Sequence, residues 1–258
     1  MKDKFIGFIV KHPIWVILAL LSFTFLAAYG AQKLVFKSDY RIFFDEDNPE
    51  LIAYDSIQKI YNKSDNVTFI VVPKDGNVFT QTHLSALKKL TKQSWQVPYS
   101  TRVDSLTNFQ YTYAEDDDMI VEDLVMNAQL LSEADVSKIK NIAINEPQLV
   151  NKIVSQSGHV SVVDVAVKLP GLDPASEVPE VVAYVRKLKD EFQNAYPGTQ
   201  IYLSGMVMMN NAFAESAMTD GSTLVPLMFL TVIVIIGLLL RTISGTFATV
   251  LIVFMSIA

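Results

Sequence analysis

Two long apolar runs near the carboxyl end dominate the pattern of hydrophobic and polar positions. Residues 224–240 carry no charge, and a second apolar run, residues 247–258, begins shortly after Arg241. At about 1.5 Å per residue in a helix, the first run with its flanks reaches roughly 27 Å, close to a bilayer core of about 30 Å. The second run reaches about 18 Å, too short to cross. We predict a transmembrane helix over residues 223–241 and the start of a truncated one over residues 245–258.

A further apolar run, residues 14–31, follows Lys11 near the start of the chain, with an aromatic residue near each end. Aromatic side chains at both edges are typical of membrane interfaces. The alternative is a cleaved signal peptide, because a basic start and small residues at the end of the run resemble a cleavage site. The run is long for a signal core, so we predict a cytoplasmic tail over residues 1–12 and a transmembrane helix over residues 13–31.

The charges at the ends of these helices favour one orientation. Lys11 precedes the first helix and Arg241 follows the second, and both lie in the cytoplasm if the amino terminus does. Residues 32–222 then form an extracytoplasmic domain. Asp220 stands ahead of the second helix, where it caps the helix or meets a basic partner. We interpret Lys11, Asp220 and Arg241 as topology anchors rather than as chemical groups.

The segment between the two helices alternates helical and strand-like patterns. Continuous or β-branched apolar runs predict strands; these runs are residues 67–72, 99–109, 159–167 and 201–203. Caps and apolar spacing of three or four predict helices; these stretches begin at Asn48, near Leu84 and at Ser132, with a shorter one over residues 146–154 and the clearest stripe over residues 178–192. After Asp118 the pattern predicts helical structure again. The alternation implies an α/β or α+β domain with crossover connections.

Composition and charge exclude several classes of function. The chain has 258 residues and a net charge of −6, while residues 32–222 hold 17 basic and 26 acidic residues, a balance of −9. An acidic domain argues against nucleic acid as a partner, because phosphate binding requires clustered Lys and Arg. Cysteine is absent, which excludes disulfides, thiolate metal sites and cysteine nucleophiles.

The polar clusters do not predict an enzyme, a metal site or a cofactor. Glu115 and the three aspartates that follow it resemble a cation site, but the glycine and alternating spacing of a calcium loop are absent, which favours a solvated acidic turn. The three histidines have no neighbouring ligand. No Gly-x-Ser-x-Gly turn surrounds any serine, so we predict no catalytic nucleophile.

A methionine-rich face directly precedes the second transmembrane helix. Met206, Met209, Phe213 and Ala217 fall on one side of a helix. Methionine adapts to varied apolar ligands, so Met206, Met209 and Phe213 are candidates for a substrate route. The alternative is ordinary packing of a helix that leads into the membrane.

Several short motifs, in their order along the chain, resemble those of one transporter superfamily. They are Lys11-His12-Pro13, Ser38-Asp39-Tyr40 through Asn48-Pro49-Glu50, Asp104-Ser105-Leu106-Thr107-Asn108, and Leu203-Ser204-Gly205 leading through Asp220 and Pro226 to Arg241-Thr242. Together they are similar to the first part of a resistance-nodulation-division (RND) transporter, in the branch of the mycobacterial large membrane proteins and the Patched-like proteins.

The resemblance implies a proton-driven exporter of hydrophobic or amphiphilic molecules, such as lipids or drugs, whose porter domain lies outside the membrane. It also implies a multi-pass protein of a bacterial inner membrane with a periplasmic domain. In the family the proton relay lies on acidic residues of the fourth span, which this chain does not reach. We therefore expect a fragment that is inactive alone. Its partners would be the bilayer, the substrate, the remaining transmembrane helices and, in an oligomer, further copies of the chain.

Two other functions remain open at this point. A membrane-anchored extracytoplasmic sensor has the same two-helix layout, but a long polar or heptad-patterned segment should then follow Arg241. An apolar run follows instead. A stand-alone binding module is the other alternative, and the sequence does not exclude it.

Overall fold

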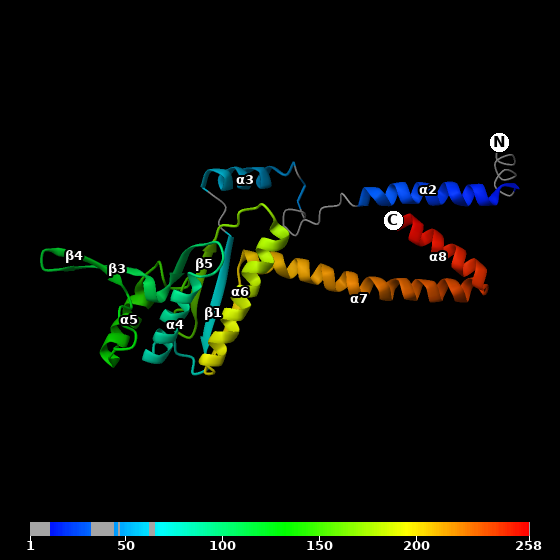
Figure 1. The fold of residues 1–258 in the computed structure, drawn as a ribbon. Coiled ribbons are helices and arrows are strands. Elements are labelled where there is room, and N and C mark those ends of the chain that lie inside the picture. Colours follow the sequence, from blue (N-terminus) through cyan, green and yellow to red (C-terminus); the bar gives the residue numbers. More distant parts are fainter. Residues whose placement is uncertain (1–10, 32–43, 46, 62–64, 258) are drawn as a thin grey trace. The chain divides into compact units, whose positions relative to one another are not determined.

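The computed structural model describes residues 11–31, 44–45, 47–61 and 65–257. Residue contacts divide the chain into two units, each described by itself (Figure 1). The sheet unit is Ser38–Ala214, and the helical unit combines Met1–Lys37 with Glu215–Ala258.

Four antiparallel strands form the central sheet of the sheet unit, in the order β2-β5-β1-β6. The strands are β1 (Asp65–Pro73), β2 (Ser100–Ser105), β5 (Ser161–Val167) and β6 (Thr199–Ser204). Helix α4 (Gln81–Ser94) joins β1 to β2, and α6 (Pro174–Ala195) joins β5 to β6. Each helix therefore connects two strands that run in the same direction with one strand between them. This split β-α-β arrangement is ferredoxin-like, and it confirms the predicted crossovers within an α+β fold.

One face of the sheet holds the core. Alternate residues of β1, including Val67, Phe69 and Val71, are buried, whereas the residues between them are only half-buried. The buried face packs against α4 and α6 in a single cluster that includes Leu87 and Val185. Period-two alternation in the strands and a stripe in each helix supply these apolar side chains. The predicted strands and helices of this core are confirmed, except that β2 ends earlier than expected.

A buried polar corner ends β2 at Ser105. Ser105 caps the short 3-10 helix η2 (Leu106–Asn108), and Asn108 completes a capping box. The Thr91 hydroxyl of α4 lies 2.9 Å from Ser105 Oγ and 3.1 Å from Thr107 Oγ1, in a buried network. Residues 106–109 therefore turn away from the sheet, which corrects the prediction of a strand over residues 99–109.

An antiparallel hairpin follows this corner, where the sequence pattern did not indicate one. It consists of β3 (Gln110–Glu115) and β4 (Asp118–Asp123), and a helical pattern was wrongly predicted after Asp118. The acidic residues form its exposed turn, as the solvated-turn interpretation expected. Helix α5 (Glu133–Asn145) then begins at the predicted capping box, in which Ser132 accepts from the Asp135 N–H. Residues 146–154 form turns rather than the predicted short helix.

Helix α3 (Pro49–Tyr61) precedes β1 and has the predicted cap. The N–H groups of Glu50 and Leu51 donate to Asn48 Oδ1 at 2.9 and 3.2 Å. Tyr54 and Ile57, which belong to the predicted apolar stripe, are exposed. The stripe therefore predicts the helix correctly but does not contribute to the core.

The helical unit contains α2 (Pro13–Ala31), most of α7 (Met206–Leu240) and α8 (Ile243–Ile257). Within the described part of the chain, α7 alone is long and apolar enough to cross a membrane, with an 18-residue window of mean hydropathy 2.8. Shorter apolar stretches are Pro13–Thr24 and Ile243–Val253. Helix α7 begins well ahead of the predicted boundary at residue 223, so the methionine-rich segment and the predicted second span are one continuous helix.

Candidate functional site

A close backbone contact holds the start of α7 against β1. Gly205 links β6 to α7 with a φ of 104°, and a Cβ placed there would lie 2.5 Å from the Asn66 carbonyl oxygen. The Met206 N–H donates to Asn66 Oδ1 at 3.1 Å. Only glycine combines this φ with this approach, because it has no Cβ. The contact places Met206 and the residues after it at the end of the sheet.

The first turns of α7 have a packed side and an exposed side. Val207, Asn210 and Asn211 are buried, whereas Met209 and Phe213 are 41% and 46% exposed. At about 100° per residue, the predicted face lies roughly a quarter-turn from the centre of the packed side. Met206 lies at the border and is half-buried. The apolar face of Met209 and Phe213 is therefore accessible rather than part of the core.

The packed side holds two amides that sequence reasoning did not single out. Within the described residues, Asn210 Oδ1 and Asn211 Nδ2 are buried and have no hydrogen-bond partner. A buried polar atom without a partner is destabilising by about 1–3 kcal/mol, so such atoms are uncommon in folded proteins. Asn210 is the neighbour of Met209 in the chain, which brings an unused acceptor next to an exposed apolar face.

A groove of about 420 Å³ lies beside these turns. It is lined by Arg186, Lys189 and Asp190 of α6, by residues 201–203 of β6 and by Met208 of α7. The lining combines two cations and one carboxylate with apolar side chains. The groove therefore favours a partner that is apolar and carries negative charge.

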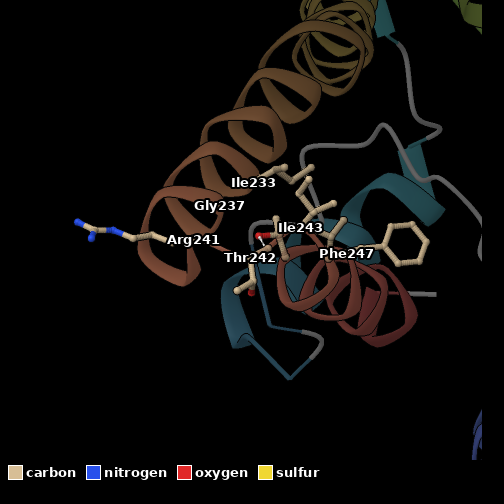
Figure 2. A pocket seen from close by; sticks show the side chains of 8 residues that line it. Ile233, Gly237, Arg241, Thr242, Ile243 and Phe247 are labelled. Atoms are coloured by element: carbon tan, nitrogen blue, oxygen red, sulfur yellow. Dashed lines mark hydrogen bonds between the residues drawn. The ribbon is translucent and has the colours of Figure 1, made fainter.

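Helices α7 and α8 form a tight hairpin in the helical unit. Their connection is Arg241–Thr242, in which Arg241 has a φ of 49° and its N–H donates to the Gly237 carbonyl at 3.0 Å. A left-handed residue with this bond is a common helix C-cap. An apolar hollow of about 510 Å³ opens between the helices, and Figure 2 shows the Arg241 guanidinium extending away from it. Arg241 belongs to the lining of the hollow, and the other lining residues carry no charge. Lys11 and Asp220, the other two predicted anchors, are exposed. Asp220 lies inside α7 rather than ahead of it, so the prediction that it caps the helix is wrong.

The family of the chain follows from a comparison with family models. The model of the MMPL family matches residues 43–258, which is more than half of the chain and includes most of the sheet unit and the α7–α8 hairpin. The chain belongs to the MMPL family. A comparison with curated proteins finds no match.

Membership in the MMPL family confirms the resemblance to RND-type transporters. MMPL proteins are membrane proteins and, in general, transporters rather than enzymes. This assignment favours transport over the sensor or binding-module alternatives. It leaves the substrate, the coupling ion and the topology of this MMPL chain as proposals.

The side-chain clusters that resemble enzyme sites have structural roles in this MMPL chain. Ser155 Oγ and Ser157 Oγ both contact His159 Nδ1, but Ser155 Oγ also accepts from the His159 and Val160 N–H groups. These bonds close a turn on the surface. Among the residues that the structure describes, no group of three His, Asp or Glu side chains could hold a metal ion.

One buried carboxylate holds the loop before α6. Glu177 accepts hydrogen bonds from the N–H groups of Gly171, Leu172 and Asp173 at 2.9 to 3.0 Å. These N–H donors, that of Asp173 above all, hold the pKa of the Glu177 carboxyl below its ordinary value, against the opposing effect of burial. The carboxylate is therefore an anchor for the loop and not a proton carrier.

Proposed function

We propose that this chain forms part of an RND-type exporter of hydrophobic or amphiphilic molecules, and that the first turns of α7 line the substrate route. The sheet unit is the porter domain, which lies in the periplasm with the amino terminus in the cytoplasm. The bilayer and the substrate are its partners. In this proposal proton influx drives transport, and residues 224–240 carry no charge that could act as a relay.

The observation that carries this proposal is the continuity of α7. Met209 and Phe213 are exposed at its first turns, and the same helix continues into the apolar window that is long enough to cross a bilayer. Between the apolar window and Phe213, α7 carries Ala217 and Met218 among polar residues, so an amphiphile that leaves the bilayer along α7 passes a mixed surface before it reaches Phe213 and Met209. Its transfer into water is unfavourable by about 0.8 kcal/mol for each CH₂ group exposed. An apolar surface above the membrane lowers this penalty.

The two unpartnered amide atoms lie beneath this surface, on the packed side of α7. Asn210 offers an acceptor and Asn211 a donor beside the apolar face. A hydroxyl, amide or headgroup atom of an amphiphile can satisfy these atoms when the packing around them opens, and a pure hydrocarbon cannot. The proposal therefore favours substrates with one polar end over uniformly apolar ones.

Photocrosslinking in membranes tests the substrate route. A fatty acid with a diazirine in its acyl chain is equilibrated with membranes that hold the full chain, and labelled peptides are identified by mass spectrometry. We expect labels on residues 206–213 as well as on the apolar window. Replacing Met209→Asp and Phe213→Asp together should reduce labelling of the first turns about tenfold, because two apolar contacts are lost.

Two controls separate substrate contact from packing. Met119→Asp on the hairpin changes another exposed methionine and should leave labelling unchanged. The amount of membrane-inserted protein is measured in parallel. Labelling of residues 206–213 that survives the double substitution would refute the route, and equal losses of labelling and of inserted protein would support the packing alternative.

A cysteine-accessibility experiment tests the proposed topology. Since the chain has no cysteine, each introduced cysteine is unique. A membrane-impermeant maleimide applied to intact cells should label Asp117→Cys but not Ser244→Cys. Labelling of both positions would place the hairpin connection and the porter domain on the same side and would overturn the topology.

A further inference from the structure

Among the residues that the structure describes, no strand pairs with the outer edge of β6. β6 is the last strand of the sheet order, so only its inner edge pairs with β1. Pro73 has no N–H, and the N–H of its partner Thr199 donates to the Tyr196 carbonyl instead. The Pro73–Thr199 pair is therefore not hydrogen-bonded. Because bonded and non-bonded pairs alternate in antiparallel strands, the N–H and C=O groups of Ile201 and Leu203 point away from β1.

The 420 Å³ groove runs beside this edge. Arg186 and Lys189 stand on its α6 side, and Tyr202 and Leu203 come from β6 itself. An edge strand with free N–H and C=O groups is a template for an added strand. Two cations outnumber the one carboxylate, Asp190, in this lining, so the groove favours an added strand with negative charge nearby.

The β3–β4 hairpin has the complementary properties. The Leu124 N–H donates to the Phe109 carbonyl, so alternation makes Tyr111–Glu122 and Tyr113–Ile120 the bonded pairs. The backbone groups of Met119 and Val121 then point outward from β4. Their side chains are 76% and 53% exposed. β4 is thus a second open edge, with apolar side chains.

The tip of the hairpin carries the matching charge. Residues 115–118 are four consecutive exposed carboxylates that cover the end of β3, the turn and the start of β4. They repel an anionic membrane surface and attract the Arg186 and Lys189 side chains. The β4 edge therefore ends in negative charge, and the β6 edge lies beside two cations. The two edges of this one chain are complementary in charge.

The two edges cannot pair within one molecule. The hairpin follows β2, which lies at the opposite end of the strand order from β6. Figure 1 shows the hairpin extending away from the four-stranded sheet. Pairing therefore requires two molecules, and the contact is head to tail.

We propose that β4 of one copy adds to the β6 edge of a second copy, with the acidic tip of the hairpin against Arg186 and Lys189. A head-to-tail contact generates a closed ring when the rotation between copies closes, and an open chain when it does not. The proposal goes beyond transport and needs no assumption about the substrate. Short strand pairing with exposed ion pairs is at the weak end of protein interfaces, and confinement to a membrane raises the local concentration of the partner.

Crosslinking between two differently tagged copies tests this contact. Full chains with Val121→Cys and with Leu203→Cys are co-expressed in one membrane, oxidised with copper phenanthroline, and analysed for a disulfide that joins the two tags. Thr101→Cys, an exposed position on the other edge strand, replaces Leu203→Cys as the matched control. We expect a two-tag product only with Leu203→Cys. A yield equal to that of the control would overturn the proposal.

Charge reversal shows whether the ion pairs select the partner. Arg186→Glu with Lys189→Glu should lower the crosslinking yield about fivefold, because two exposed ion pairs become repulsive. Asp117→Lys with Asp118→Lys on the other copy should restore it. Lys74→Glu with Lys168→Glu, which makes the same charge change on the surface of the sheet unit, should have no effect. A loss without rescue, or a crosslink of Val121→Cys to a different protein, would refute pairing between copies. Fatty-acid labelling of α7 is independent of these variants, so the two proposals fail separately.

Discussion

Replacing Gly205→Ala tests the contact that places the candidate site. Two effects that lower the free energy of unfolding add at this position. A φ of 104° is unfavourable for an L-residue by about 1–2 kcal/mol. The added Cβ would also lie 2.5 Å from the Asn66 carbonyl oxygen and 3.0 Å from the Val67 Cα, and backbone atoms of a central strand yield little. Overpacking of this kind costs about 1–3 kcal/mol, so we expect a total loss of about 2–5 kcal/mol in the free energy of unfolding.

Two other glycines separate these costs. Gly76 has a φ of 70°, and a Cβ added there would meet no atom within 4 Å, so Gly76→Ala measures the backbone cost alone, about 1–2 kcal/mol. Gly198 has neither restriction, and Gly198→Ala should stabilise the protein by about 0.4–1 kcal/mol through the unfolded chain. The difference between the variants at 205 and 76 then isolates the contact with β1.

Tryptophan fluorescence during urea unfolding in detergent provides the measurement. The sequence has two tryptophans, and Trp15→Phe leaves Trp95, beside the C-terminal end of α4, as the reporter of the sheet unit. The free energies of unfolding should rank Gly198→Ala, wild type, Gly76→Ala and Gly205→Ala from most to least stable. If Gly205→Ala is no less stable than Gly76→Ala, α7 does not depend on close contact with β1, and the argument for the position of Met206 fails.

Three further substitutions have defined outcomes. Glu177→Gln should weaken the acid dependence of stability. Because the pKa of the Glu177 carboxyl is lowered by folding, its contribution to the free energy of unfolding is present above its ordinary pKa of 4.5 and is lost as pH falls through the folded-state pKa. Unfolding midpoints measured from pH 7 to 3 should therefore fall more steeply in the wild type than in the variant. Thr91→Val breaks the buried hydroxyl network with Ser105 and should cost about 1–3 kcal/mol in urea unfolding, whereas Thr112→Val on the exposed hairpin face should change stability by less than about 0.5 kcal/mol. Asn210→Leu removes a buried amide whose Oδ1 has no partner, so thermal stability should hold or rise while labelling by the diazirine fatty acid at residues 206–213 falls.

The core of the sheet unit could be predicted because its side chains follow a simple period. Phe69 and its neighbours alternate in β1, and Leu84, Leu87 and Leu90 recur along α4. In these elements the same apolar residues determine both the local structure and the packing. The caps at Asn48 and Ser132 could also be predicted, because each cap is a local hydrogen bond between a side chain and a nearby N–H.

The hairpin was missed because its pattern comes from two different surroundings. Tyr111 and Tyr113 stack with ring centres 5.6 Å apart on one face, while Met119 and Val121 are exposed on the other. Apolar residues on both faces, beside a run of carboxylates, resemble neither a half-buried strand nor a helix. The turn at Asp116, with a φ of 53°, also lacks the glycine that usually marks a hairpin.

Only part of the candidate substrate surface could be predicted from the sequence. The spacing of Met206, Met209 and Phe213 indicated a helical face, but no signal indicated that Asn210 and Asn211 would be the buried side. Asparagine is mostly exposed in folded proteins, so sequence reasoning places it in solvent. At these turns the asparagines are buried and the apolar side chains are exposed. This arrangement depends on tertiary packing, and we interpret it as a sign of function rather than of folding.

Two of the motifs that resemble the family form turns between elements of the fold. They therefore carry information about the fold and not about the substrate or the partners. Asp104-Ser105-Leu106-Thr107-Asn108 ends β2 in a buried network with Thr91, and Leu203-Ser204-Gly205 starts α7 against the backbone of β1. Such positions tolerate few side chains, because each needs a particular hydrogen bond or the absence of a Cβ. Met209, Phe213 and the exposed edge of β4 are under no such restriction from folding. Recognition of the family therefore rests on residues that build the sheet unit, and the proposed substrate and partner contacts depend on residues that the fold leaves free to vary.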